Sequence, residues 1–194
     1  MILIPAGASA FNQPGMNLGF TSFADAGAPP EGYVGPRIIL SEVVRWYDSS
    51  TFRDANGDKL PGRNRVSLLV NTHQLYFLSK LNDPLTGAQL GLDVIVPLVV
   101  GSISTPGNSE SNAGGLGDFI FSPVFQWNTH TLFGLPYYHR FQLHVTAPTA
   151  DFDKRFVFNP GDNVWSFAPY YAQTLWFLPY VNLEISLRHQ LLRF

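Results

Sequence analysis

The sequence lacks cysteine and is poor in charge. Without cysteine, a disulfide framework, a catalytic thiol and a cysteine-ligated zinc site are all excluded. Charged residues make up 13% of the chain, whereas soluble domains usually have about 25%. The net charge of −2 offers no basic surface, so we expect no nucleic-acid partner.

Long apolar runs are also missing. A membrane-spanning helix needs about 20 consecutive apolar residues, and stretches such as 94–100 are far shorter. Aromatic residues nevertheless make up 14% of the chain, while the mean hydropathy is only +0.04. A chain that is rich in aromatics, poor in charge and average in hydropathy suits a β-barrel that is apolar on one face only.

The first 32 residues are rich in Gly, Pro, Ala and Asn and show no periodicity. We expect residues 1–32 to form an irregular arm, which could plug a barrel built by residues 33–194. Ala8-Ser9-Ala10 has the form of a signal-peptide cleavage site, but no basic region or full apolar region precedes it. It is either the tail of a signal whose start is lost or an ordinary loop.

Strand-like alternation dominates the rest of the chain. Seven segments of strand character lie at about 33–47, 64–79, 88–100, 117–127, 137–147, 164–176 and 181–192. In the fifth segment, apolar and polar positions alternate as Phe141, Leu143 and Val145 against Arg140, Gln142 and His144. Since successive side chains of a strand point to opposite faces, each segment has one apolar face. Glu42 departs from this pattern, because it shares the phase of Leu40 and Val44.

The connections alternate in length. Those after the first, third and fifth segments are long (48–63, 101–116 and 148–163), and the others are shorter (80–87, 128–136 and 177–180). Outer-membrane barrels have short periplasmic turns and long outer loops, and aromatic residues gather at both ends of their strands. We therefore predict an all-β, antiparallel up-and-down transmembrane β-barrel in the bacterial outer membrane, with the long loops outside.

Several short motifs resemble those of a known family. They are Ser22-Phe-Ala-Asp-Ala-Gly-Ala-Pro-Pro-Glu-Gly-Tyr33, Phe52-Arg-Asp-Ala-Asn-Gly-Asp-Lys59, Leu92-Asp-Val-Ile-Val-Pro97, Gly115-Leu-Gly-Asp118, Val145-Thr-Ala-Pro-Thr-Ala-Asp-Phe-Asp-Lys154 and Asn163-Val-Trp-Ser-Phe-Ala-Pro169. In this order they resemble the outer-membrane proteins associated with the meta-cleavage pathway of phenol degradation. The resemblance implies an outer-membrane β-barrel that takes part in uptake of hydrophobic or aromatic compounds, and it implies no catalytic residues.

The strand count departs from what the resemblance implies. Single-chain bacterial barrels have an even number of strands, and an open sheet in lipid leaves unpaired backbone groups, each costing several kcal/mol. With about seven strands, we expect an incomplete barrel. The chain is then a fragment, unless the N-terminal arm adds a strand or several chains share one barrel.

Two short segments invite a search for chemistry. Asp54-Ala-Asn-Gly-Asp58 opens like a calcium loop, but Lys59 replaces the expected glycine and Arg65 the closing glutamate. A surface turn at Asn56-Gly57 is the favoured interpretation, with weak cation binding left open. Gly114-Gly-Leu-Gly117 lacks the following Gly-Lys-Ser/Thr of a phosphate loop, so we expect it to provide a tight bend before the fourth segment.

The histidines show no catalytic or metal-ligating spacing. They are His73, His130, His139, His144 and His189. No His-Glu-x-x-His motif occurs, and no Gly-x-Ser-x-Gly motif supports a serine nucleophile. We therefore expect no enzymatic activity, no bound metal and no cofactor, with an outer-membrane hydrolase as a distant alternative.

The polar faces of the segments supply the candidate site. The residues expected to line a pore are Arg37, Arg45, Asn71, His73, Asp93, Asp118, Gln126, Arg140, Gln142, His144, Glu184 and Arg188. Inside a barrel such groups either pair with one another or line a water-filled path. The expected function is passive uptake of small hydrophobic or aromatic compounds, with outer-membrane lipid and the solute as partners and an oligomer possible. The alternatives are a soluble β-barrel that binds a lipid or other apolar ligand, and a non-conducting structural barrel.

Overall fold

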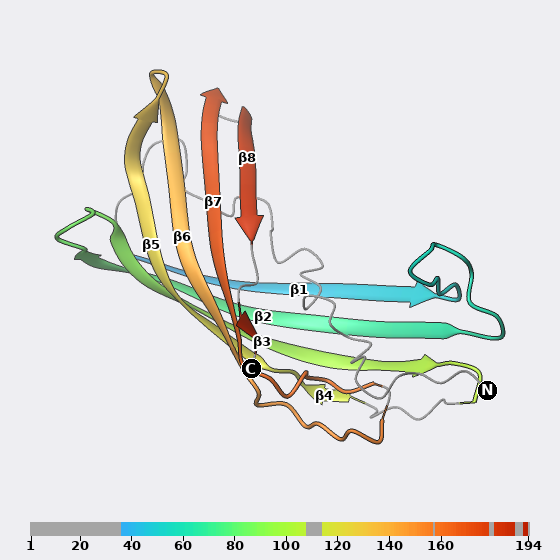
Figure 1. Cartoon of the computed structure of the whole chain (residues 1–194). Helices are drawn as coiled ribbons and strands as arrows, with labels where there is room; N and C mark the ends of the chain where they lie inside the picture. The colour runs from blue at the N-terminus through green and yellow to red at the C-terminus, as the bar shows by residue number, and fades with distance from the viewer. Residues whose placement is uncertain (1–35, 108–113, 157, 179–180, 189–191, 194) are drawn as a thin grey trace.

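The computed structural model describes residues 36–107, 114–156, 158–178, 181–188 and 192–193, and these form one antiparallel sheet (Figure 1). Its strands are β1 (Arg37–Ser49), β2 (Arg65–Asn82), β3 (Gln89–Ser104), β4 (Gly114–Leu116), β5 (Phe119–Leu132), β6 (Leu135–Ala147), β7 (Ser166–Leu178), β8 (Val181–Arg188) and β9 (Leu192–Arg193). The long strands follow one another in the order β1-β2-β3-β5-β6-β7-β8, while β4 pairs with β3 and β9 with β7. The predicted all-β, antiparallel up-and-down order is confirmed.

The sheet curls strongly into a half-barrel. In Figure 1, β1 to β3 form one wall and β5 to β8 form a second. The sheet curves between β3 and β5 from one wall into the other. Along the strands that the structure describes, the sheet ends at β1 on one side and β8 on the other. The N-terminal arm 1–32, with Ala8 to Ala10, lies outside the described residues. No helix in the described part of the chain is long and apolar enough to cross a membrane.

The seven predicted segments correspond to the seven long strands, and two short strands are additional. β4 comes from the glycine-rich segment and pairs with residues 98–100 of β3. Gly114 has φ 127°, and a Cβ there would lie 2.4 Å from the Val99 carbonyl oxygen, so only glycine fits. The N–H of Gly117 then donates to the carbonyl of Pro97 (2.8 Å), and the chain bends into β5 as expected.

The alternation of long and short connections is also present. The long ones join β1 to β2, β3 to β5 and β6 to β7. The turn between β5 and β6 is shorter than predicted, because Leu132 pairs with Leu135. Its two residues, Phe133 (φ 55°) and Gly134 (φ 78°), both have positive φ, as in the type I′ turn that suits the twist of a hairpin. Phenylalanine is an unusual residue for this conformation, so the turn has no clear signal in the sequence.

The two faces of the sheet differ in polarity. Arg140 of β6 and Tyr76 of β2 are three strand spacings apart, about 14 Å in a flat sheet, yet the Arg140 Cζ lies 5.0 Å from the Tyr76 ring centroid. Such side chains meet only inside the curl, so their face is the concave one. Cross-strand partners share a face, and the registers then assign these buried residues to it: Thr72, Tyr76, Leu78, Asp93, Ile95, Ile120, Ser122, Val124, Gln126, Tyr138, Arg140, Gln142, His144, Ala168, Tyr170, Ala172 and Thr174.

The convex face carries exposed apolar side chains. In the same registers, the large apolar residues exposed on it are Ile38, Leu40, Val44, Trp46, Leu69, Leu75, Phe77, Leu92, Leu98, Val100, Phe119, Phe121, Phe141 and Leu183. Leu40 and Trp46 of β1 are exposed to 77% and 74%. The period-2 alternation of the sequence therefore places large apolar side chains outside the curl, while the inside holds buried polar side chains together with apolar ones such as Ile95 and Val124.

Candidate functional site: the polar lining of the half-barrel

A carboxylate lies at the centre of the concave face. Asp93 of β3 is 2% exposed, and Gln74 of β2 donates through Nε2 to both of its carboxylate oxygens (2.9 Å each). Gln142 of β6, 1% exposed, donates to Asp93 Oδ2 (3.0 Å). Ser41 of β1 donates in turn to Gln74 Oε1 (3.0 Å). One buried carboxylate thus connects four strands, and its oxygens are satisfied by amide donors.

A second chain of hydrogen bonds runs toward the short-turn end. Tyr76 donates from its hydroxyl to Gln126 Oε1 (3.3 Å), and Gln126 donates to Asn128 Oδ1 (2.9 Å). Asn128 donates to Gln89 Oε1 (3.1 Å), and Gln89 donates to the carbonyl of Ser79 (2.6 Å). Because each amide both donates and accepts, the chain fixes the orientation of every member.

A buried arginine lies between two tyrosine rings. The Arg140 Cζ is 5.0 Å from the ring centroid of Tyr76 and 5.9 Å from that of Tyr170. Cation–π attraction helps to hold the guanidinium across the curl. That charge also acts on Asp93 and on Tyr76. The ring of His144 lies 5.2 Å from Tyr170 on the same face.

The structure brings together most of the predicted lining. The predicted residues on the concave face are Arg37, Arg45, Asp93, Gln126, Arg140, Gln142 and His144. Glu184 and Arg188 pair with Thr174 and Tyr170, which puts their backbone on this face, and for these two the structure describes the backbone alone. His189 lies outside the described residues. Gln74, Tyr76 and Tyr170 belong to the lining but were not predicted. Alternation along β7 would have placed Tyr170 there, whereas the phase predicted for β2 put Gln74 and Tyr76 on the opposite face.

Two predicted lining residues lie on the opposite face. Asn71 and His73 share the convex face with Leu75 and Phe77, so their predicted inward orientation is wrong. The even positions of β2 include Leu68, Val70 and Leu78, so both of its faces carry apolar residues and the phase was ambiguous.

Asn71 and His73 lie beside Glu42, the polar residue that interrupts the apolar face of β1. Glu42 pairs across the ladder with His73, and Asn71 donates from Nδ2 to Glu42 Oε1 (2.7 Å). The hydrogen bond from Asn71 therefore satisfies part of the hydrogen-bonding capacity of the Glu42 carboxylate on the convex face.

The Asp118 carboxylate, at the end of the curl, is bound by backbone N–H groups. Its Oδ1 accepts from the backbone N–H groups of Thr149 and Ala150 (3.0 Å each), and its Oδ2 accepts from that of Asp162 (2.8 Å). A Cβ at Gly161 would lie 2.6 Å from Asp118 Oδ1, so the backbone must approach closely there. Asp118 thus fastens the connection between β6 and β7 to the start of β5.

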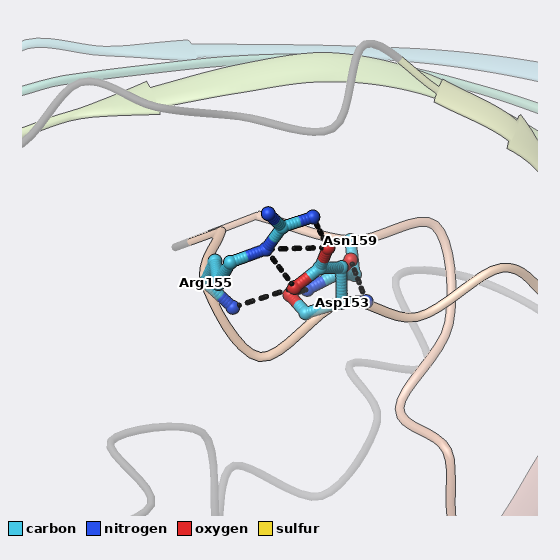
Figure 2. A network of polar contacts seen from close by, with 3 residues as sticks. All are labelled: Asp153, Arg155 and Asn159. Atoms are coloured by element: carbon cyan, nitrogen blue, oxygen red, sulfur yellow. Dashed lines mark hydrogen bonds and ion pairs between the residues drawn. The ribbon is translucent and has the colours of Figure 1, made fainter.

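A second acidic residue organises the same connection. Figure 2 shows Asp153 within a cluster with Arg155 and Asn159. Arg155 donates from Nε and Nη2 and from its backbone N–H to the Asp153 carboxylate, and Asn159 exchanges hydrogen bonds with the Asp153 backbone (2.9 and 3.0 Å). These bonds, above all those from the Arg155 side chain, lower the pKa of Asp153 to about 2. The family-like motif around Asp153 therefore stabilises the fold of this loop.

Aromatic side chains gather on the convex face near the short turns. The rings of Trp127 and His139 stack at 4.5 Å, and Trp127 donates to the carbonyl of Thr86 in the β2–β3 turn (2.9 Å). His130 Nδ1 and His139 Nε2 are 2.9 Å apart, within hydrogen-bonding distance. The cluster connects the β2–β3 turn to the short-turn end of β5 and β6.

The calcium-like segment forms a turn. The Asp54 carboxylate accepts from the backbone N–H groups of Asn56 and Asp58 (2.9 Å each), and Gly57 has φ 87°. Asp54 Oδ1 therefore accepts hydrogen bonds from the backbone of its own loop, as in an Asx turn. Within the described residues, no three His, Asp or Glu side chains gather as metal ligands would.

The fold and the lining define an antiparallel half-barrel sheet that buries polar groups inside its curl and exposes apolar side chains outside. A model of the family described as "Putative MetA-pathway of phenol degradation" matches residues 49–192. The chain belongs to this family, so the resemblance of its motifs is confirmed. No curated protein and no solved structure matches the chain.

Proposed function

We propose that the chain forms part of an outer-membrane β-barrel that lets small hydrophobic or aromatic compounds pass without energy coupling. The observation that carries the proposal is the distribution of polarity over the curled sheet. Large apolar side chains such as Leu40, Trp46 and Phe121 are exposed on the convex face, while Asp93, Arg140 and Gln142 are buried on the concave face. Lipid suits the apolar convex face, and the polar interior of a barrel suits the concave one.

The same observation argues against a soluble carrier. A soluble barrel that binds an apolar ligand buries its apolar faces inside and presents polar faces to water. Here the inner face buries a carboxylate, a guanidinium and a series of amides beside its apolar residues, and the large exposed apolar side chains lie on the outer face. A contiguous exposed apolar face of this extent is rare on soluble monomers and marks an interaction with lipid or protein.

The proposal sets a condition on the two edges of the sheet. In lipid, each unpaired N–H or C=O costs several kcal/mol. The outer edges of β1 and β8 must therefore be paired in the membrane, either by further strands or by another chain. Membership in a family linked to phenol degradation supports an aromatic solute.

A matched pair of lysine substitutions tests the membrane setting. Leu75→Lys puts a charge on the convex face in the middle of β2, where a lysine at the bilayer midplane costs about 2–4 kcal/mol. Leu85→Lys makes the same change in the β2–β3 turn, where the side chain is already 93% exposed. We expect Leu75→Lys to abolish the heat-modifiable folded band in outer-membrane fractions and Leu85→Lys to keep it.

Two results would refute the proposal at different levels. Normal folding of Leu75→Lys in buffer without detergent would refute the membrane setting and favour the soluble carrier. Folding in the membrane without any conductance in planar bilayers would refute passage and leave a structural barrel.

A further inference from the structure

The long connection between β1 and β2 contains a small hairpin that places two basic residues side by side. Arg53 and Lys59 form an antiparallel bridge. Their neighbours on both sides supply the two flanking backbone hydrogen bonds (2.9 Å each). Arg53 and Lys59 are therefore a non-hydrogen-bonded pair, in which both side chains lie on one face with Cβ atoms about 4.5–5.5 Å apart.

The acidic residues of the hairpin do not neutralise this basic pair. Alternation along the two arms places Asp54 and Asp58 on the opposite face. Asp54 Oδ1 also accepts from two backbone N–H groups of its own turn (2.9 Å each). Arg53 donates from Nη1 to the carbonyl of Gly57 (2.7 Å), which is a neutral acceptor. Within the described ranges, neither Arg53 nor Lys59 forms an ion pair.

The geometry of the pair suits a phosphate group. Both side chains are exposed, and like charges directly opposite each other destabilise a hairpin, so an anion between them relieves that repulsion. With Nη1 of Arg53 donating to Gly57, its Nε and Nη2 remain on the other edge of the guanidinium. That edge can bind phosphate through two parallel hydrogen bonds, while Lys59 adds a point charge. A phosphate has enough charged oxygens around one centre to accept from both side chains at once.

The hairpin follows the long-loop end of β1 (Figure 1). Trp46, on the convex face, lies three residues before that end and is 74% exposed. In a membrane barrel, exposed tryptophan rings lie at the level of the lipid headgroups. The proposed membrane setting therefore places the hairpin next to a layer of lipid phosphates.

From this arrangement, and resting on the proposed membrane setting, we propose that Arg53 and Lys59 together bind a phosphate group of a lipid headgroup. The β1–β2 connection is then anchored to the membrane surface on the long-loop side. The two residues bind the headgroup as a unit, because one phosphate contacts both.

Native mass spectrometry of the full chain in detergent micelles tests this site. The protein is titrated with dioleoyl phosphatidic acid and with dioleoyl phosphatidylcholine, whose choline cation neutralises its phosphate. Wild-type protein should bind phosphatidic acid more tightly than phosphatidylcholine. Arg53→Gln and Lys59→Gln should each weaken phosphatidic acid binding about threefold, and Lys59→Arg, which keeps the charge, should restore it. Lys80→Gln, a matched change of an exposed lysine at the short-turn end of β2, should leave the affinity unchanged.

Three results would overturn the phosphate site. Equal affinity of the wild type for the two lipids would show that the phosphate is not recognised. An equal loss in Lys80→Gln and Lys59→Gln would reduce the effect to overall charge. Displacement of the lipid by an equal concentration of inorganic phosphate would make the ligand free phosphate rather than a headgroup. These results do not bear on passage, which the planar-bilayer conductance tests, or on the membrane setting, which the Leu75→Lys variant tests.

Discussion

Replacing Asp118 with alanine removes the acceptor of three backbone N–H groups, those of Thr149, Ala150 and Asp162. A hydrogen bond to a charged group contributes about 1.5–3 kcal/mol. The full sum overstates the loss, because these donors are only part-buried and water can reach them in the variant. We expect the connection 148–165 to open more easily by about 3 kcal/mol, which is roughly a 150-fold larger opening constant.

Hydrogen exchange measures this opening directly. Amides of residues 149, 150 and 162 should lose protection in Asp118→Ala, while the centres of β5 and β6 keep theirs. Asp118→Asn retains one acceptor oxygen and should give an intermediate loss. Asp151→Ala, an exposed acid in the same connection, serves as the matched control. Wild-type protection at residues 149, 150 and 162 in Asp118→Ala would show that this carboxylate does not hold the loop.

Two further predictions concern the connections of the sheet. Because the folded-state pKa of Asp153 is lowered to about 2, below the ordinary value of about 3.9, its ion pair with Arg155 stabilises the loop above about pH 4 and is lost as the pH falls toward about 2. Pepsin cleavage within 148–165 should therefore rise in the wild type as the pH falls over this range, and it should be high throughout in Asp153→Asn. Equal cleavage of the two proteins at pH 4 would contradict the role of the ion pair. Phe133→Gly should raise the midpoint of thermal unfolding, since Phe133 is 89% exposed and has φ 55°. The free energy of unfolding should increase by about 1 kcal/mol. A lower midpoint would mean that a contact of the ring stabilises the protein by more than the relieved strain.

Long-range contacts decided much of the lining. Tyr76 and Tyr170 look like ordinary strand aromatics in the sequence, and only the curl brings both rings to Arg140. The two glutamines on Asp93 come from β2 and β6 and meet it for the same reason. Side-chain alternation assigns a residue to a face, but it carries no information about which strands approach one another across that face.

Asp118 illustrates a different limit. Its position at the start of a polar phase suggested a lining residue, whereas its partners come from a connection more than 30 residues further along the chain. Backbone donors have no signature in a sequence, so an acidic residue that anchors a loop looks the same as one that lines a pore.

The sequence alone determined the fold class, the antiparallel order, the alternating loop lengths and most of the inward-facing polar residues. These follow from a local rule, the period of two along a strand, and from the lengths between strands. The tertiary structure alone decided the curl, the face of Asn71 and His73, the hydrogen bonds around Asp93 and the anchoring by Asp118. These depend on contacts between distant strands, and where both phases of a strand are apolar, as in β2, only its pairing with neighbours chooses the face.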